Sequence, residues 1–324
     1  MSFAATLRQI IPSRPRRARH LWAMSCALVS VAGASAADAE RWQRHTSLPE
    51  ARTEVAAALA GNRIVVAGGF VDDGANSARA DVYLVPDNRW SRLPDLPQAV
   101  DHAASAGRGG RVYVLGGYGA DRRPLRSAFV LEGGGWRELA QLPEARAAAA
   151  AAISGGKLYL LGGVDERRAL ARVALALDLR AGTWSRVPGP SPREHLAAAA
   201  LRGRVYAIGG RSAGIDTNTR AFESYDPETR RWTVLKRLPS ARGGTGAAAV
   251  NGRIVSAGGE QPGGTIASVY AYDPSRRAWR RLQDLPSPRH GLGVVAAGGR
   301  VYVLGGGPQP GLTVSGAVES LRIP

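Results

Sequence analysis

The sequence predicts an all-β fold built from six copies of one four-stranded unit, and two periodic features predict it. A strand-like phrase that ends in two glycines occurs six times, for example RVYVLGG at 111–117. The first glycines of these phrases lie 46 to 49 residues apart, and they are Gly68, Gly116, Gly162, Gly209, Gly258 and Gly305. Tryptophan recurs with the same period, at Trp42, Trp90, Trp136, Trp184, Trp232 and Trp279. Self-similarity at such a period indicates a repeat architecture, so residues 37–324 are predicted to form one domain.

Each repeat divides into four short strands. In the third repeat, small residues at 147–152 precede the strand phrase 157–163, a third strand ends at a turn, and a fourth begins near Trp184. The apolar residues show no 3.6-residue period, which argues against a helical repeat. The alanine-rich run 147–152 aligns with glycine- and valine-rich runs in later repeats. We therefore expect it to be an inner strand, where small side chains let neighbouring backbones approach closely.

The two ends of the chain are complementary fragments of one repeat. The first tryptophan strand, at Trp42, has no glycine pair before it. The last pair, Gly305-Gly306, is followed by one strand near 314–322 and by no tryptophan. We expect the N-terminal strand to become the outermost strand of the sixth unit, which closes the ring and leaves no open array edge.

These motifs resemble those of the kelch-repeat β-propellers. The glycine pair after an apolar strand, the spaced tryptophans and the Tyr-Asp-Pro turns at 225–227 and 272–274 are that family's repeat signature. The resemblance covers about residues 42–322. It implies a six-bladed propeller with four antiparallel strands per blade and ligand binding at one mouth of the central channel. It says little about function, because one fold serves many functions.

The N-terminus has the pattern of a secretory signal peptide. A cationic segment, Arg14–Arg19, precedes the apolar run Leu21–Gly33 and the small residues Ala34–Ala36. The apolar run is too short to span a membrane, so we expect a cleavable signal over 1–36, a mature chain without a transmembrane segment, and a periplasmic or secreted protein. Arg16-Arg17 raises the alternative of twin-arginine export, but Arg19-His20 stand where that signal has apolar residues, which favours the Sec route.

Composition excludes several function classes. The formal charge is +17, and 41 of the 43 basic residues are arginine. After residue 36 no run of five or more basic residues occurs, which argues against nucleic-acid binding. Cys26 is the only cysteine and lies in the predicted signal. The mature chain then has no disulfide, thiolate metal site or cysteine nucleophile, and it lacks the Cys–Tyr cross-link that a kelch-type copper-radical oxidase needs.

The candidate site lies where the repeats meet the channel. Strand two of each repeat ends at the glycine pair and the antiparallel strand one begins beside it, so residues at these positions are expected to converge on one mouth. An arginine stands sixteen residues before five of the six glycine pairs: Arg52, Arg146, Arg193, Arg242 and Arg289. These arginines either hydrogen-bond turn carbonyls within each blade or form a cationic ring for a carboxylate or phosphate.

The neighbouring positions differ from blade to blade. Polar and aromatic residues gather in the first, second and fourth repeats, whereas the third and fifth have few. The candidate ligand-binding residues from these columns are Glu54, His102, His195, His290, Phe70, Tyr118, Arg211 and Glu260. An uneven mouth is what a specific ligand requires; the alternative is that these side chains are only solvated.

A metal site is the second interpretation of the same columns. The histidines His102, His195 and His290 stand near Glu54, Asp101 and Glu194, which are possible additional ligands. Groups spread around a ring of blades are expected to be too far apart to bind one ion, so no metal is predicted. The sequence contains no Walker loop, GxSxG or HExxH motif, so no cofactor is predicted either.

Two functions follow. The first is an exported, non-catalytic propeller that binds a protein, a peptide or an anionic glycan at the channel mouth. The alternative is a sugar-acid mutarotase, because exported bacterial kelch propellers include sialic-acid mutarotases. That resemblance implies that the arginine column holds the carboxylate and that Glu54, His102 or His195 moves protons during ring opening.

Overall fold

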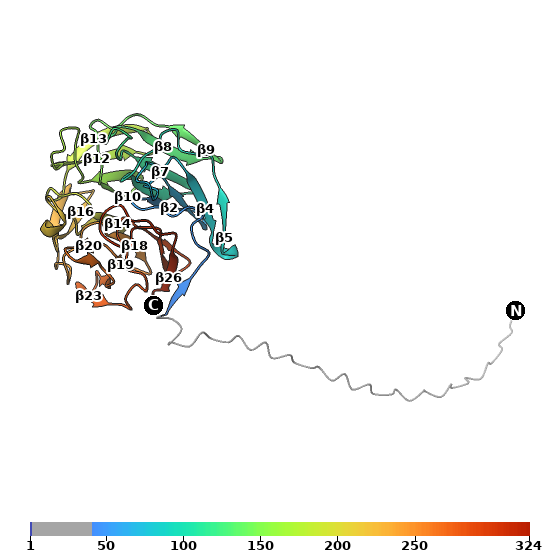
Figure 1. Cartoon of the computed structure of the whole chain (residues 1–324). Coiled ribbons are helices and arrows are strands. Elements are labelled where there is room, and N and C mark those ends of the chain that lie inside the picture. Colours follow the sequence, from blue (N-terminus) through green and yellow to red (C-terminus); the bar gives the residue numbers. More distant parts are fainter. Residues whose placement is uncertain (2–40) are drawn as a thin grey trace. The chain divides into compact units, whose positions relative to one another are not determined.

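The fold is described by a computed structural model that covers Met1 and residues 41–324; the remainder of the predicted signal peptide lies outside the described residues. Residues 41–324 form six four-stranded antiparallel sheets. Figure 1 shows the sheets arranged in a ring. The predicted six-bladed, all-β architecture is confirmed. Among the described residues, no helix has the length and apolar character needed to cross a bilayer.

The first five blades each take four consecutive repeat strands. Blade one consists of β2 (Ala56–Ala60), β3 (Arg63–Ala67), β4 (Ala80–Leu84) and β5 (Arg89–Arg92). Blade two consists of β6 (Ala104–Arg108), β7 (Arg111–Leu115), β8 (Ala128–Glu132) and β9 (Gly135–Glu138). Blade three consists of β10 (Ala150–Ser154), β11 (Lys157–Leu161), β12 (Val173–Asp178) and β13 (Thr183–Pro188). Blade four consists of β14 (Ala197–Leu201), β15 (Arg204–Ile208), β16 (Phe222–Asp226) and β17 (Arg231–Val234). Blade five consists of β18 (Gly246–Val250), β19 (Arg253–Ala257), β22 (Val269–Asp273) and β23 (Ala278–Arg281).

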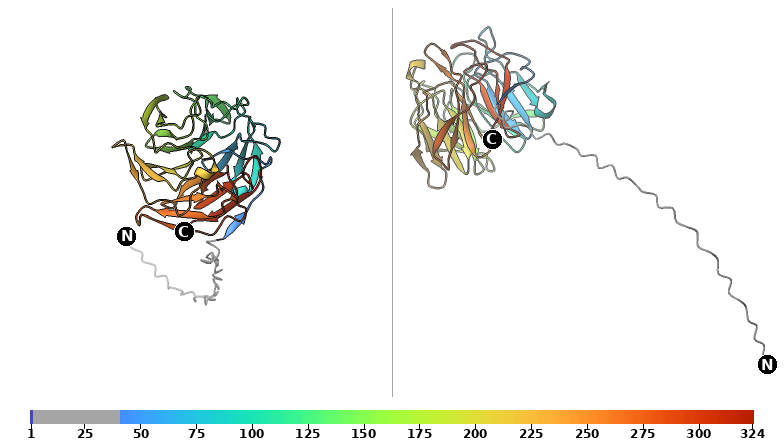
Figure 2. Two further views of the ribbon diagram at one scale, coloured as in Figure 1. Left: turned by 60° about the vertical axis from the view of Figure 1, so that its left-hand side comes forward. Right: turned by 90° about the horizontal axis from the view of Figure 1, so that it is seen from below.

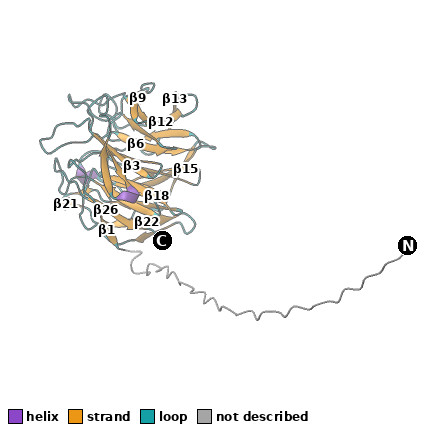
Figure 3. Cartoon of the chain, turned by 90° about the vertical axis from the view of Figure 1, so that its right-hand side faces the viewer, coloured by secondary structure: helices purple, strands orange, loops and turns teal. Residues whose placement is uncertain are grey.

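Little regular structure lies outside the blades. A small hairpin of β20 (Glu260–Gln261) and β21 (Gly264–Thr265) extends from blade five. Two single-turn 3₁₀ helices, η1 (Val85–Asp87) and η2 (Ile215–Thr217), appear in purple among the orange strands of Figure 3.

The sixth blade joins the two ends of the chain. It consists of β24 (Gly293–Ala297), β25 (Arg300–Leu304), β26 (Val318–Arg322) and the N-terminal β1 (Trp42–Arg44), with β1 paired to the outer side of β26. Figures 1 and 2 show the blue β1 beside the red C-terminal strands. The predicted closure by strand exchange between the termini is confirmed.

Small residues occupy the inner strands because the blades converge there. A Cβ on Gly107 would lie 1.9 Å from the carbonyl oxygen of Leu59 in the neighbouring blade. A Cβ on Gly293 would lie 2.4 Å from the Ala57 Cβ. The second half of the alanine-rich run 147–152 lies in the inner strand β10, as expected, whereas 147–149 precede that strand.

The periodic tryptophans fasten each blade to the one before it. All six indole N–H groups donate a hydrogen bond of 2.8–3.0 Å to a backbone carbonyl of the preceding blade or of the loop that follows it. Trp42 closes this series by donating to Gln283, which follows the fifth blade. Each half-buried indole thus packs on its own sheet, and its N–H group links that sheet to the neighbouring blade.

Candidate functional site

The site is built at the channel mouth, which we define as the end of the channel where the six glycine pairs lie. We call the position sixteen residues before each glycine pair the arginine column; it is Val100 in the second repeat and arginine in the others. In every blade, the residue that follows the glycine pair forms a backbone bridge with the residue that follows the arginine column. These backbone pairs are Thr53–Phe70, Asp101–Tyr118, Ala147–Val164, Glu194–Arg211, Gly243–Glu260 and His290–Gly307. The expected convergence of the two columns on one mouth is therefore confirmed.

One residue per blade forms an inner ring around the mouth. The six inner-ring residues all have a positive φ of 51–61°, and they are Glu54, His102, Ala148, His195, Gly244 and Gly291. Their backbones are joined by a closed series of six inter-blade hydrogen bonds of 2.9–3.3 Å, the last of which runs from Val55 N–H to the Gly291 carbonyl.

The inner ring carries side chains at a backbone geometry that favours glycine. A non-glycine residue at positive φ costs free energy, and such residues gather at functional sites. Three of the four non-glycine members of the inner ring are titratable: Glu54, His102 and His195.

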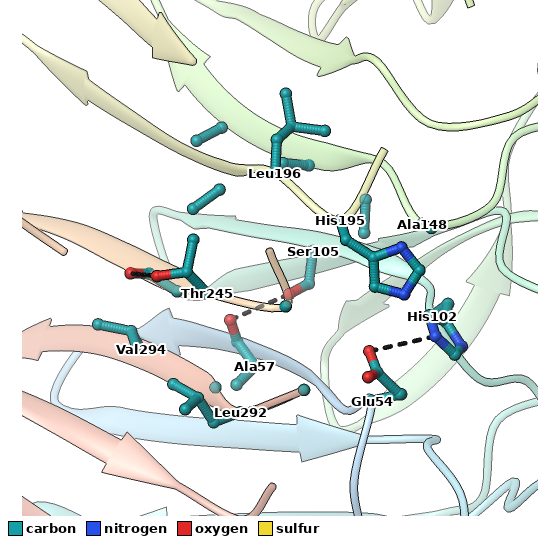
Figure 4. A pocket seen from close by; sticks show the side chains of 18 of the residues that line it. Glu54, Ala57, His102, Ser105, Ala148, His195, Leu196, Thr245, Leu292 and Val294 are labelled. Carbon is teal, nitrogen blue, oxygen red and sulfur yellow. Dashed lines mark hydrogen bonds and ion pairs between the residues drawn. The ribbon is translucent and has the colours of Figure 1, made fainter. Parts of the chain in front are cut away.

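The carboxylate of Glu54 lies between two imidazoles. Its Oε2 is 3.4 Å from His102 Nε2, and its Oε1 is 3.3 Å from His290 Nδ1. On its other side, His102 Nδ1 contacts the buried carboxylate of Asp101. Figure 4 shows Glu54, His102 and His195 pointing toward one another in the channel.

This arrangement moves the pKa values of the acid and of its neighbours in opposite directions. Burial would raise the pKa of Glu54, but the charge of His102, the contact from His290 and the charge of His195 outweigh burial, so the pKa is lowered. Burial would lower the pKa of His102, but Glu54 and Asp101 raise it above its ordinary value. The pKa of His290 is raised in the same way, against burial, by Glu54 and Glu260. The two histidines thus favour the ionised form of the Glu54 carboxyl group.

The opposite side of the mouth is organised by Arg211. Its guanidinium donates to Glu194 Oε1 at 2.9 Å and to Glu260 Oε1 at 2.6 Å. Burial would lower the pKa of Arg211, but these two carboxylates raise it. His195 Nδ1 lies 3.0 Å from Glu194 Oε1, in ion-pair range but without the alignment of a hydrogen bond.

Together these contacts form one chain of alternating charge around the mouth. Successive members lie within ion-pair distance, in the order Arg122, Asp101, His102, Glu54, His290, Glu260, Arg211, Glu194 and His195. The two ends approach each other, because the His102 and His195 rings are 4.9 Å apart between centroids. Of the predicted residues, Glu54, His102, His195, His290, Arg211 and Glu260 are brought together here.

The two predicted aromatic residues lie beside this chain but are covered. Phe70 and Tyr118 flank the ring of His102, with centroids 5.8 and 5.5 Å away. Their exposed fractions are only 2% and 9%, since the Arg122 guanidinium lies over both rings at 4.8 and 5.1 Å. Burial raises the pKa of Tyr118, which keeps its hydroxyl protonated.

Two arginines at the mouth were missed from the sequence. Arg122 and Arg168 occupy corresponding loop positions of the second and third blades, at φ values of 60° and 61°, where the first blade has Gly74. Arg168 stacks on Tyr118 at 5.8 Å and donates to the Arg122 carbonyl at 2.7 Å. The missed signal was an arginine in two repeats at a position where another repeat has glycine.

The structure does not bring the five column arginines to the mouth. Their exposed fractions are 0–2%. Four of them donate to the carbonyl of the first glycine of their own pair: Arg52, Arg193, Arg242 and Arg289. Arg146 donates instead to the carbonyls of Ala145 and Val173. The cationic-ring interpretation is therefore corrected: these guanidinium groups serve turn carbonyls inside the blades.

Below the inner ring the channel is narrow and lined by small residues. Its cavity of about 140 Å³ is bounded by the inner ring and by inner-strand alanines such as Ala57, Ala104 and Ala151. A cavity of this size holds a few water molecules but no sugar. A larger ligand would therefore contact the mouth from outside rather than enter the channel.

Family comparison agrees with the architecture. The family model described as the KLHDC2/KLHL20/DRC7 Kelch-repeats domain matches residues 128–306, more than half of the chain, and the Kelch motif model matches residues 51–97. The solved structure of YjhT is similar in fold, with a TM-score of 0.75 and 15% identity over 86% of this chain and 97% of that one.

Curated relatives match over short segments. The chain is 36% identical to the F-box protein AFR of Arabidopsis thaliana over 69 residues, which is 21% of this chain and 18% of the relative. It is 36% identical to the N-acetylneuraminate epimerase of Yersinia enterocolitica over 87 residues, which is 24% of this chain and 22% of that enzyme. The chain thus aligns with only about a fifth of the length of these relatives.

Proposed function

The chain belongs to the kelch-repeat family of β-propellers, and we propose that it binds an anionic sugar at the channel mouth. The observation that carries this proposal is the stacking of Arg122 and Arg168 on Tyr118, whose ring flanks His102 of the inner ring. Both guanidinium groups stack on Tyr118, and the Arg122 side chain is half exposed. Arg122 donates from Nη1 to Asp101, and Arg168 donates from Nη2 to the Arg122 carbonyl. Stacking leaves their other N–H groups to bind a carboxylate, and it reduces the conformational freedom that binding would remove.

The floor of the mouth suits the rest of such a ligand. His102, His195 and Glu54 lie on the inner ring with side chains that are 9–12% exposed. Their exposed edges present donors and acceptors for hydroxyl groups. A few convergent polar groups beside aromatic side chains are typical of small-ligand sites. The ligand is therefore proposed to place its carboxylate on the arginines and its hydroxyls on the inner ring.

Replacing Arg122 by Gln is expected to weaken sugar-acid binding about 10- to 100-fold, since a hydrogen bond to a charged group is worth about 1.5–3 kcal/mol. Binding of N-acetylneuraminate is measured by calorimetry in the presence of a chelator, with its neutral methyl ester as the matched ligand. Arg111→Gln is the control, because Arg111 begins the second strand of the same blade. Its side chain is 51% exposed against 50% for Arg122, and it also pairs with one carboxylate.

Equal affinity for the acid and its ester would contradict the proposal. So would an Arg122→Gln variant that binds as tightly as the wild type. Loss of binding in Arg111→Gln as well would show that the effect is not local to the mouth. If N-acetylneuraminate does not bind, glucuronate and an acidic-peptide series replace it, and binding of a peptide alone would favour the protein-recognition alternative.

A second candidate, isomerisation of a sugar acid, is favoured by the contact between Glu54 and His102. Opening a hemiketal ring requires a base at the anomeric hydroxyl and an acid at the ring oxygen. A carboxylate and an imidazole 3.4 Å apart at the mouth provide such a pair. The partial similarity to an N-acetylneuraminate epimerase supports the same reaction class.

For this candidate, Glu54→Gln is expected to lower the rate of anomer interconversion by about 10²–10⁴-fold, the usual contribution of a positioned acid or base. The rate is followed by NMR exchange spectroscopy on a sugar acid, with Glu132→Gln as a distant control. A wild-type protein that binds the sugar acid without accelerating exchange would reject the isomerase and leave the binding proposal standing.

A further inference from the structure

Three potential metal ligands from different blades meet at the inner ring. Glu54, His102 and His195 come from the first, second and fourth repeats, and their carboxylate oxygens and ring nitrogens lie within 4.8 Å of one another. The expectation that groups spread around the ring are too far apart is therefore wrong for this set. They converge because the inner ring is narrow and all three have the same backbone conformation, with φ of 51–52°.

Each of the three side chains is held from behind by a further residue. Asp101 contacts His102 Nδ1, Glu194 lies 3.0 Å from His195 Nδ1, and His290 lies 3.3 Å from the Oε1 of Glu54. A carboxylate on one imidazole nitrogen fixes the ring orientation and leaves the other nitrogen as the ligand, which is the usual outer support of a metal-bound histidine. His102 has such a hydrogen-bonded carboxylate in Asp101, and Glu194 lies within ion-pair distance of His195 Nδ1 without the alignment of a hydrogen bond.

The rest of the inner ring leaves room around these groups. Ala148, Gly244 and Gly291 complete the ring, and their side chains are methyl groups or hydrogens. A Cβ on Gly291 would lie 2.5 Å from the Glu54 Oε1, so a side chain at this position would displace the carboxylate. An open position beside the three ligands is what separates a ligand-accepting metal site from a closed structural one.

We propose that Glu54, His102 and His195 bind one divalent first-row transition metal, of which Zn²⁺ is the first to test. Two imidazoles and one carboxylate form a ligand set that such ions favour. A tetrahedral ion with bonds of about 2.0–2.1 Å holds its ligand atoms about 3.3–3.4 Å apart. The distance between Glu54 Oε2 and His102 Nε2 is already 3.4 Å. All three ligand atoms lie within 4.8 Å of one another, so coordination requires His195 to move closer by at most about 1.5 Å.

The surrounding charges agree with a cation at this point. Asp101 and Glu194 stand directly behind the two histidines and are negatively charged partners for a bound ion. Arg122 and Arg211 pair with those carboxylates on their outer sides rather than with the three ligands. This inference goes beyond the proposed sugar binding, because the three groups meet whichever ligand occupies the mouth.

The experiment is a metal titration of the tag-free full chain after removal of metal with a chelator. Zn²⁺ binding is measured by calorimetry, and Co²⁺ is added in parallel because its visible absorption reports the coordination number. We expect one ion per chain. Glu54→Gln and His195→Ala should each weaken binding at least about 100-fold, and Asp101→Asn about 10- to 100-fold by releasing His102.

The variants are chosen to remain folded. Alanine already occupies the equivalent inner-ring position in the third blade, at Ala148 and φ 51°, and Gln keeps the shape of Glu54. His45→Gln is the control, since His45 bonds Ser320 Oγ at 2.7 Å and packs against Tyr83 and Tyr302 away from the inner ring. Thermal unfolding of each metal-free variant shows whether the fold is retained.

Absence of stoichiometric binding to the wild type would overturn the proposal. Binding that survives in a folded Glu54→Gln or His195→Ala variant, or that is lost equally in His45→Gln, would overturn it as well. The titration contains no sugar and the sugar assay contains a chelator, so failure of one proposal is distinguishable from failure of the other.

Discussion

Replacing Arg289 by Met is expected to destabilise the protein by about 3–5 kcal/mol, because it leaves a buried carboxylate without its partner. Arg289 and Glu319 have exposed fractions of 0% and 1%, and their side chains form an ion pair of 2.8 Å. Glu319 would keep a hydrogen bond from Ser287 Oγ at 2.9 Å and an ion pair with the exposed Arg44 Nε at 3.9 Å. One neutral donor and one distant, solvated guanidinium do not offset the desolvation of a buried charge.

The position of Glu319 makes this change large. It lies in the middle of β26, where its backbone is paired with Val303 on one side and with Arg44 of β1 on the other. An uncompensated charge at this point weakens the blade that joins the two ends of the chain. Arg289 also precedes His290, so the same variant is expected to disturb the contact between His290 and Glu54.

Arg242→Met is the matched control. Arg242 occupies the same position one blade earlier with an exposed fraction of 0%, and among residues 41–324 no carboxylate forms an ion pair with it. It bonds Ser240, Ser268 and two backbone carbonyls, and burial lowers its pKa to about 10. Its removal leaves no unpaired charge behind, so the loss of stability should be smaller by about 2 kcal/mol or more.

Urea unfolding measures both variants, since urea does not screen the ion pair as guanidinium chloride does. In Arg289→Met, the additional change Glu319→Gln should recover part of the lost stability by removing the charge. Equal destabilisation by Arg289→Met and Arg242→Met would show that lost carbonyl hydrogen bonds, and not the unpaired carboxylate, dominate the effect.

The architecture could be predicted because it repeats. Six glycine pairs and six tryptophans at one period determine the number of blades, and the incomplete first and last repeats determine how the ring closes. Sequence spacing places a residue at one end of a strand but does not say which way its side chain points. The column arginines show this limit: they stand beside the mouth in sequence, yet they turn into the blades because the glycine carbonyls there need donors.

The site could be predicted in part, from the positions at which the repeats differ. Glu54, His102 and His195 follow the arginine column by two residues, so their convergence follows from the repeat itself. The contacts between side chains of different blades could not be predicted in this way. A contact such as that of Arg211 with Glu260 depends on the distance between two repeats rather than on positions within one. Arg122 and Arg168 come from loops whose left-handed backbone becomes visible only in the structure.

Replacing Gly116 by Ala is expected to destabilise the protein by at least about 3 kcal/mol, because the new methyl group meets backbone and not a movable side chain. Gly116 has a φ of 58°, and its Cβ would lie 2.1 Å from the carbonyl oxygen of Arg146 in the next blade. That oxygen accepts a hydrogen bond of 2.8 Å from the Gly117 N–H. Relieving the clash would break this link between the second and third blades.

Gly109→Ala separates the steric effect from the backbone effect. Gly109 belongs to the same blade and has the same φ of 58°, but a Cβ there meets nothing within 4 Å. It should cost only about 1–2 kcal/mol, the penalty of a left-handed alanine. The difference between the two urea midpoints then measures the inter-blade contact, and equal midpoints would contradict it. The clash at Gly116 would also displace Tyr118, which lies two residues further along the chain. The backbone of Tyr118 pairs with that of Asp101. The repeated glycine pair would then position the residues of the mouth without touching a ligand itself.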